Sequence, residues 1–217
     1  MSFGTIYTHE LNPRTTSILA VAKEQGLQLE VIYADKEGNK ENYEKLLRIN
    51  PLGQVPTFVG ADGYVLTECM AIALYITSRS DTTTLLGSTR REYFETIKWM
   101  SLANSDLLPN AGGVVFPLIG RTLPVRKDHQ DSLRAFHEDC RLLESHLSTN
   151  KYLVTDHVTL ADFFTASMMK FPFMLGHKVL HAKYPRLTEW FNRVYEMRMF
   201  KEVAGDLHLV DAPFPTL

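Results

Sequence analysis

The sequence predicts a small mixed α/β unit followed by an all-helical unit. Strand and helix patterns alternate through the first eighty residues, and an Asp-Gly pair between two short apolar runs is typical of a hairpin. Beyond residue 90, only long segments with helical spacing of apolar residues remain. We therefore expect two domains, at residues 1–80 and 89–217, joined by a polar Ser/Thr-rich linker at 81–88.

A β-α-β pattern and a β-β-α pattern make up the first unit. The first pattern consists of a strand at 3–7, a helix that begins at Asn12-Pro13 and ends at Gly26, and a strand at 29–33. A polar loop at 35–42 and a short helix with Leu46 and Leu47 follow. The second pattern consists of strands at 56–59 and 64–66 and a helix from Thr67 or Glu68, whose inward-facing residues are Ile72, Leu74, Tyr75 and Ile76. Together they form a small mixed sheet with helices on both faces, which is the thioredoxin-like arrangement.

Helical periodicity dominates the second unit. The expected helices lie at 90–108, 128–147, 160–170 and 187–197, and the stretch from Gly112 to Leu123 is treated as a loop. Thr159 and Asp162 have the spacing of a capping box, in which each residue's side chain bonds the other's backbone N–H. We interpret this motif as a helix start with no further role.

Composition and charge exclude several function classes. With 45% apolar and 22% charged residues the chain is globular, and a net charge of −2 predicts neither a nucleic-acid partner nor a membrane surface. No signal peptide or bilayer-spanning run is present in the sequence, so a cytoplasmic location is expected. The two cysteines, Cys69 and Cys140, lie far apart, and we expect both thiols to be reduced.

The histidines are scattered without metal-ligand spacing, so no metal is expected, and His137 and His146 are assigned to the surface of a long helix. No Gly-rich phosphate loop or nucleophile elbow occurs. The remaining candidates for chemistry lie in the first unit.

Two short motifs in the first unit are candidates for ligand binding. Val55-Pro56 opens a strand, where proline is tolerated, and a cis bond here would leave the Val55 backbone unpaired and able to bind an extended peptide. Glu68-Cys69 lies at a helix N-terminus, whose free N–H groups attract a carboxylate while Glu68 attracts an amine. An acidic residue in a first helical turn is also a simple stabilising charge, so this alternative stays open.

The two motifs together resemble the glutathione site of the cytosolic glutathione transferases. That family has N-P-x-G-x-V-P followed by E-S-x-A-I, and this chain has NPLGQVP at 50–56 and ECMAI at 68–72. The capping box and the run Tyr184-Pro185-Arg186-Leu187 with Trp190 also match the family's helical domain, so the resemblance spans essentially the whole chain. It implies the glutathione transferase fold, a thioredoxin-like N-terminal domain followed by an all-helical C-terminal domain.

Further segments narrow this resemblance to one subgroup. Gly4–Thr8, Trp99–Leu107 and Phe116-Pro117-Leu118 are similar to the transferase-like domain of the gamma subunit of elongation factor one. Those proteins continue into a Lys-rich linker and another domain. Because this chain ends at Leu217, it resembles a free-standing, fungal-type member.

The resemblance implies which residues hold glutathione. The backbone of Val55, in the turn with Pro56, pairs with the cysteinyl backbone of the tripeptide. Glu68 and the N–H of Cys69 hold the γ-glutamyl end, and Gln54 lies near it. Cys69 replaces the usual Ser, which removes a hydroxyl donor, and its thiol is either a small buried apolar group or a reactive one.

Three charged residues are candidates for the remaining contacts. Asp106 corresponds to a residue that reaches across a two-fold dimer to the γ-glutamyl amine in many family members, although it is equally a solvated charge. For the glycine carboxylate the nearest cations are Lys40 and Arg48, and neither matches a motif closely.

Catalysis requires a glutathione thiolate. A free thiol, with a pKa of about 8.5, is only a few per cent ionised at neutral pH, and one charge-assisted hydrogen bond lowers that pKa by roughly one to two units. Arg14 is our leading donor, Asn12 is second at the family's Ser position counted back from Gly26, and Tyr7 at the strand end is third. Arg14 as a surface residue and Tyr7 as core packing stay open.

The sequence as a whole predicts a glutathione transferase. Glutathione is the expected co-substrate, without a metal, and the second substrate is a small hydrophobic electrophile bound between the domains near Tyr7, Trp99 and Phe116. A cytoplasmic homodimer is expected. The alternative is a catalytically weak or inactive scaffold related to the elongation factor subunit.

Overall fold

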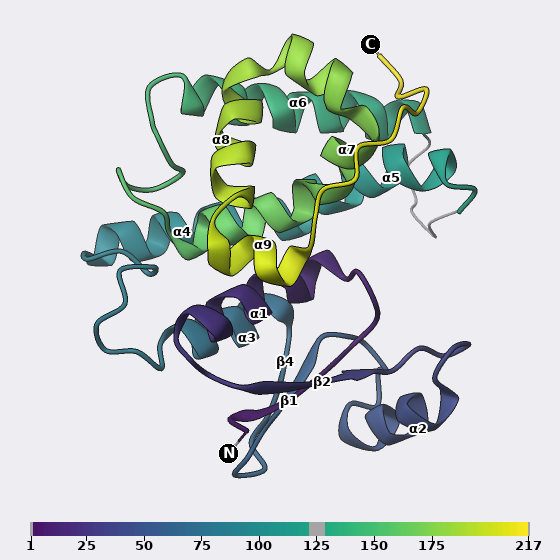
Figure 1. Cartoon of the computed structure of the whole chain (residues 1–217), viewed down its shortest axis with the longest axis vertical. Coiled ribbons are helices and arrows are strands. Elements are labelled where there is room, and N and C mark those ends of the chain that lie inside the picture. Colours follow the sequence, from purple (N-terminus) through teal and green to yellow (C-terminus); the bar gives the residue numbers. More distant parts are fainter. Residues whose placement is uncertain (1, 122–128, 217) are drawn as a thin grey trace.

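The computed structural model describes residues 2–121 and 129–216, and it consists of a small sheet packed beneath a helical layer (Figure 1). The strand order is β2-β1-β3-β4, with β1 and β2 parallel and the other pairs antiparallel. The elements of this half are β1 (Gly4–Thr8), α1 (Pro13–Glu24), β2 (Leu29–Tyr33), α2 (Lys40–Ile49), β3 (Thr57–Gly60), β4 (Val65–Thr67) and α3 (Cys69–Thr77). Both predicted supersecondary patterns and the thioredoxin-like arrangement are confirmed.

The alternation of side chains along β1 sends neighbouring residues to opposite faces of the sheet. Ile6 belongs to the large core shared with α1 and α3, whereas Tyr7 packs with Ala34 and Leu46 on the α2 side. In Figure 1, α1 and α3 lie between the sheet and the helical layer, and α2 lies on the far side. Tyr7 therefore faces away from the domain junction.

The second half is entirely helical in the described residues. Its elements are α4 (Arg90–Leu102), a π-helical turn η1 (Ala103–Leu107), α5 (Leu108–Leu118), α6 (His129–Leu147), α7 (Leu160–Lys183), α8 (Pro185–Tyr195) and α9 (Arg198–Ala204). Helix α1 packs against α7 and α9 as well as α3, and one cluster of buried apolar residues runs through both halves. The two-part fold is confirmed, while the linker at 81–88 stays a prediction.

Two helix predictions and one loop prediction need correction. The helix expected at 90–108 is divided by η1, and α5 continues to Leu118 through most of the stretch that we treated as a loop. Residues 122 and 123 of that stretch, and Asp128 before α6, lie outside the described residues. Helix α7 continues past the predicted end at 170 to Lys183, although Pro172 and Gly176 are residues that favour a break.

The C-terminal segment explains why α7 bends at Gly176. Gly176 has non-helical dihedral angles, and a Cβ there would lie 2.5 Å from the Phe214 ring. In Figure 1 the segment after α9 runs back along α7, and the Val210 N–H donates to the Met174 carbonyl at 2.8 Å. Phe214 thus fills the space that a side chain at Gly176 would occupy.

The prediction that His137 lies on the surface is wrong. It is fully buried, its Nδ1 lies 2.7 Å from the Tyr184 hydroxyl, and burial lowers the pKa of its imidazole. His146 is half-buried, with Nε2 3.0 Å from the Leu153 carbonyl. The contact between His137 and Tyr184 joins residues 47 positions apart, which helical periodicity cannot reveal.

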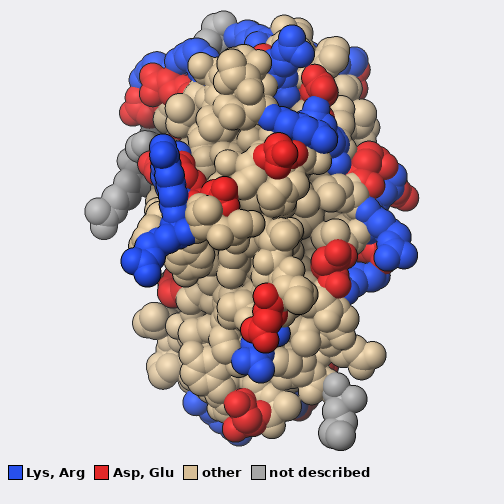
Figure 2. All heavy atoms as spheres, turned by 90° about the vertical axis from the view of Figure 1, so that its left-hand side faces the viewer, with Lys and Arg blue, Asp and Glu red and all other residues tan. Residues whose placement is uncertain are grey.

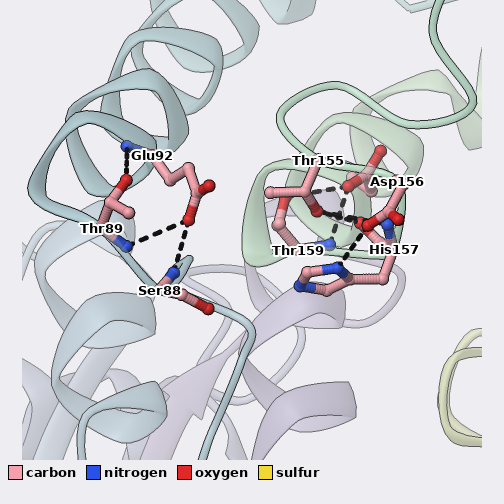
Figure 3. A network of polar contacts seen from close by, with 8 residues as sticks. Ser88, Thr89, Glu92, Thr155, Asp156, His157 and Thr159 are labelled. Carbon is pink, nitrogen blue, oxygen red and sulfur yellow. Dashed lines mark hydrogen bonds and ion pairs between the residues drawn. The ribbon is translucent and has the colours of Figure 1, made fainter.

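Side-chain caps fix the starts of two long helices (Figure 3). At α4, Thr89 accepts from the Glu92 N–H, and the Glu92 carboxylate accepts from the N–H groups of Ser88 and Thr89. At α7, the predicted bond from the Thr159 N–H to the Asp162 carboxylate is present at 2.8 Å. The Asp162 carboxylate is buried and also accepts from the Thr159 hydroxyl, the Leu153 N–H and the Trp190 indole N–H.

Positive and negative side chains are interspersed on the face shown in Figure 2 and do not gather into one patch. Among the described residues, no helix combines the length and the apolar character that crossing a membrane demands.

Substitution Asp162→Ala is expected to destabilise the fold by roughly 3–5 kcal/mol, because it leaves three buried N–H donors without an acceptor at about 1–3 kcal/mol each. Chemical denaturation followed by circular dichroism measures the loss. The control is Asp156→Ala in the preceding loop, where the exposed carboxylate forms an ion pair with the His157 ring. That variant should leave the midpoint nearly unchanged, and equal losses in both variants would contradict the prediction.

Candidate functional site

A cavity of about 510 Å³ lies where the sheet meets the helical layer. This volume is typical of sites for small ligands. Its lining comes from the α1 N-terminus, the turn before β3, the β4–α3 junction and η1. The lining residues are Arg14, Asn50, Leu52, Gly53, Gln54, Val55, Pro56, Thr67, Glu68, Cys69 and Asn104.

The turn before β3 is held by the side chain of Asn50. This buried amide donates to the Gln54 carbonyl at 3.1 Å and to the Thr57 hydroxyl at 3.0 Å. Gly53 has φ +61°, and a Cβ there would lie 2.5 Å from the Tyr43 hydroxyl, so this position requires glycine. These contacts give the sequence NPLGQVP one conformation.

The same turn presents a free stretch of backbone to the cavity. The Val55–Pro56 bond is cis, as considered from the sequence. Within the described part of the chain, the N–H and C=O of Val55 make no hydrogen bond. Such a pair can bind an extended peptide as an added strand does.

Glu68 lies at the N-terminus of α3 and lines the same cavity as this turn. It is exposed and has φ +69°, a left-handed conformation that costs a residue with a Cβ roughly 1–3 kcal/mol and is concentrated at functional sites. Because Glu68 makes no capping bond with its side chain, the carboxylate is available to a ligand. The first N–H groups of α3 are unsatisfied by the helix itself and favour an anion.

Arg14 joins the two halves of the molecule at this cavity. Asn12 caps α1 by accepting from the Arg14 N–H at 3.0 Å, and Pro13 occupies the first helical position. The Arg14 Nε donates to the Asn104 Oδ1 at 2.9 Å. Its terminal guanidinium nitrogens have no partner among the described residues, so the charge is free to meet a ligand.

Cys69 is buried and neutral. Its thiol donates to the same Asn104 Oδ1 at 3.5 Å, and burial raises the pKa of the thiol despite the nearby Arg14 charge. This agrees with the interpretation of Cys69 as a small buried group. Cys140 is also a free, buried cysteine, and burial raises its pKa well above the ordinary value.

A second, smaller cavity of about 160 Å³ lies on the other side of the α1 N-terminus. The β1–α1 loop, the end of β2, and helices α7 and α9 form its walls. Its lining residues are Thr8, His9, Glu10, Leu11, Asn12, Pro13, Thr15, Thr16, Leu19, Val31, Tyr33, Lys170, Phe171, Val203 and Ala204. The two linings share no residue, but the first turn of α1 contributes to both: Arg14 lines the larger cavity, and Asn12 and Thr15 line the smaller one.

Comparison with known proteins identifies the family. The N-terminal domain of glutathione S-transferase matches residues 2–78, and the C-terminal domain of the same family matches residues 107–197. Glutathione S-transferase mdpJ of Emericella nidulans is 44% identical over 94% of this chain and 92% of its own length. The chain belongs to the glutathione S-transferase family.

Two solved structures of the family share this fold. The transferase-like domain of elongation factor 1-gamma from Saccharomyces cerevisiae has a TM-score of 0.81 and 30% identity, with 99% of each chain covered. Glutathione transferase URE2P6 of Phanerochaete chrysosporium, solved with oxidised glutathione, has a TM-score of 0.80 and 23% identity over 93% of this chain and 94% of its own. The resemblance drawn from the sequence is confirmed.

The larger cavity brings together most of the binding residues that the sequence predicts. Gln54, Val55, Pro56, Glu68 and Cys69 all line it, and so does Arg14, the leading thiolate donor. Asn12, the second candidate donor, lines the smaller cavity, and its side-chain oxygen is engaged as the α1 cap.

Other predicted residues lie outside this cavity. Asp106, Lys40 and Arg48 are exposed and absent from its lining. Tyr7 and Trp99, expected on the wall of the electrophile pocket, are buried in the interior. The Trp99 ring packs against the His146 ring, with 4.7 Å between the two ring centroids. Phe116 lines neither cavity.

Asn50 and Asn104 were not singled out from the sequence. Both lie inside motifs that carried the family resemblance, NPLGQVP and the segment Trp99–Leu107. Asn104 reaches the cavity from the π-helical turn, a type of irregularity that is frequent at functional sites. Among the described residues, no group of three or more His, Cys, Asp or Glu side chains could hold a metal ion.

Both thiols of this family member are expected to react slowly with iodoacetamide in the native state at neutral pH. Because burial raises the pKa of each, the reactive thiolate is scarcer than in a free cysteine. Mass spectrometry before and after denaturation measures the labelled fraction, and the variants Cys69→Ser and Cys140→Ser assign the label. Native labelling at the rate of a free cysteine would contradict this expectation.

Proposed function

We propose that the protein is a glutathione transferase that conjugates the thiolate of glutathione to small electrophiles. The observation that carries this proposal is a single cavity in which an unpaired guanidinium, a free stretch of extended backbone and a helix N-terminus with a carboxylate converge. The three belong to Arg14, Val55 and Glu68.

Glutathione fits this cavity in one orientation. The free backbone of Val55 pairs with the cysteinyl residue, the N–H groups at the start of α3 take the γ-glutamyl carboxylate, and Glu68 takes its amine. Gln54 lies beside that end of the tripeptide. We further propose a homodimer in which Asp106, exposed on η1, contacts the γ-glutamyl amine bound by a second copy of the chain.

Arg14 would hold the glutathione sulfur as a thiolate. The Arg14 Nε donates to Asn104 of the helical half, which fixes the orientation of the guanidinium. Its two terminal nitrogens are then left to donate to the ligand. With an aryl halide, the sulfur forms the new C–S bond, the halide leaves with the electron pair of the C–halogen bond, and the thiol proton goes to solvent. Orientation and thiolate stabilisation supply the rate.

The electrophile would occupy the smaller cavity. It adjoins the α1 turn that presents the thiolate, and Leu11, Val31 and Phe171 make it partly apolar. An apolar cavity of about 150 Å³ is known to hold benzene, so this one accommodates a single aromatic ring. The cytoplasmic location stays a prediction from the sequence.

Substitution Glu68→Gln is expected to weaken glutathione binding about tenfold or more, because the γ-glutamyl amine loses a charged acceptor. Titration calorimetry with glutathione measures the change. The control is Glu92→Gln in the α4 cap, which lies outside the cavity. Unchanged affinity in Glu68→Gln would contradict the proposed orientation of the tripeptide.

Substitution Arg14→Ala is expected to lower kcat/KM at neutral pH about tenfold or more. It should also raise the pH of half-maximal rate by roughly one to two units, because the bound thiol loses its charged donor. A pH profile of conjugation to a chlorodinitrobenzene measures both effects.

Two further variants separate charge from orientation. Asn104→Ala keeps the guanidinium but removes the bond that orients it, so we expect an intermediate shift in the pH of half-maximal rate. Arg91→Ala, on the exposed face of α4, should change neither kcat/KM nor the pH profile. A profile for Arg14→Ala that matches the unmodified protein would remove Arg14 from its proposed role.

The similarity to the elongation factor domain supports a second candidate, a scaffold without substantial turnover. The conjugation assay decides between the two. Glutathione binding with a rate no higher than the reaction in solution would favour the scaffold, and turnover would favour the enzyme.

A further inference from the structure

Lys170 is a cation on the wall of the smaller cavity. It lies on α7, and its Nζ donates to the Ala204 carbonyl at 2.5 Å. Because Lys170 and Ala204 both line the cavity, this bond places the ammonium group at its wall. This hydrogen bond links α7 to the end of α9, and the β1–α1 loop forms another wall of the same cavity.

The ammonium group has unused bonding capacity. Lysine carries three N–H donors, and the described structure accounts for one of them. No carboxylate lies within ion-pair distance of Lys170 in the described part of the chain, whereas Lys23, Lys178 and Lys201 each have such a partner. Burial lowers the pKa of Lys170, since the charged form loses hydration, and an anion bound beside it would reverse that effect.

A capping role alone accounts for only part of this arrangement. Lysine near a helix C-terminus bonds the last carbonyls favourably, and Ala204 ends α9. That role needs one N–H group and does not require a cavity beside it. Glu10, the only carboxylate in the described lining, is exposed to solvent, which screens its repulsion of an anion.

We propose that Lys170 binds an anionic oxygen of the electrophile, so that the preferred second substrates are small aromatic electrophiles that carry a carboxylate or an ionised phenol. The aromatic ring packs against the apolar wall at Leu11, Val31 and Phe171, and the anionic oxygen accepts from the Lys170 ammonium. This proposal rests on the proposed function and adds a charge to the hydrophobic substrate expected from the sequence.

The test compares one acceptor in two charge states, a chlorodinitrobenzoate and its methyl ester. The ratio of kcat/KM for acid over ester is measured for the unmodified protein, Lys170→Met and Lys170→Arg. The intrinsic reactivity of each acceptor cancels when this ratio is compared between variants. Lys178→Met is the matched control, because Lys178 is on the same helix, outside the cavity and paired with Asp211.

The ratio is expected to fall roughly tenfold or more in Lys170→Met, to be largely retained in Lys170→Arg and to be unchanged in Lys178→Met. The same ratio in Lys170→Met and the unmodified protein would overturn the role of Lys170 and leave the proposed function intact. Failure of the unmodified protein to conjugate either acceptor would instead contradict the proposed function.

A binding measurement tests Lys170 without turnover. Premade glutathione conjugates of the acid and the ester are titrated into each variant by calorimetry, after thermal unfolding has shown that the variant is folded. Selective weakening of the acid conjugate in Lys170→Met supports the proposal. Equal weakening of both conjugates, or of neither, assigns Lys170 to capping α9 alone and overturns it.

Discussion

The packing of α1 between the sheet and the helical layer is the constraint on which both cavities depend. One side of this helix packs on α3, and the other side packs on α7 and α9. Its first turn is therefore fixed relative to both halves, and Asn12 and Pro13 set the direction in which it starts. The larger cavity lies on one side of that turn and the smaller cavity on the other. A nucleophile held at this turn would lie at the boundary between two binding sites.

The charges in the larger cavity complement a zwitterionic peptide. Arg14 is directed by a neutral amide, Asn104, and not by a carboxylate, so its positive charge is not cancelled within the protein. Cys69 stays uncharged because it is buried. Glu68 is exposed at the N-terminus of α3, whose first N–H groups favour an anion. Arg14 and Glu68 therefore each carry a charge that has no ion-pair partner among the described residues and that a bound ligand would balance.

Local sequence patterns predicted the features that depend on neighbouring residues, but not those that depend on contacts between distant segments. Strand alternation and helix signals predicted the sheet, its order of elements and the all-helical second half, because these depend on neighbours along the chain. The continuation of α7 past Pro172 and Gly176 was not predictable in this way. The bend inside this helix at Gly176 lies against Phe214, which packs there from the C-terminal segment. The burial of His137 by Tyr184 has the same origin, a contact between distant segments.

Two local motifs with fixed spacing, NPLGQVP at 50–56 and ECMAI at 68–72, were enough to predict the family, the fold and the residues of the turn before β3. Which candidates share a cavity depends on contacts between segments that are distant in the sequence. The pleat of β1 turned Tyr7 toward α2, capping engaged the Asn12 side chain, and the domain junction brought Asn104 to Arg14 across 90 positions of sequence. Lys170 entered the smaller cavity in the same way, since the fold of α7 against α1 and α9 sets its position and no motif marks it.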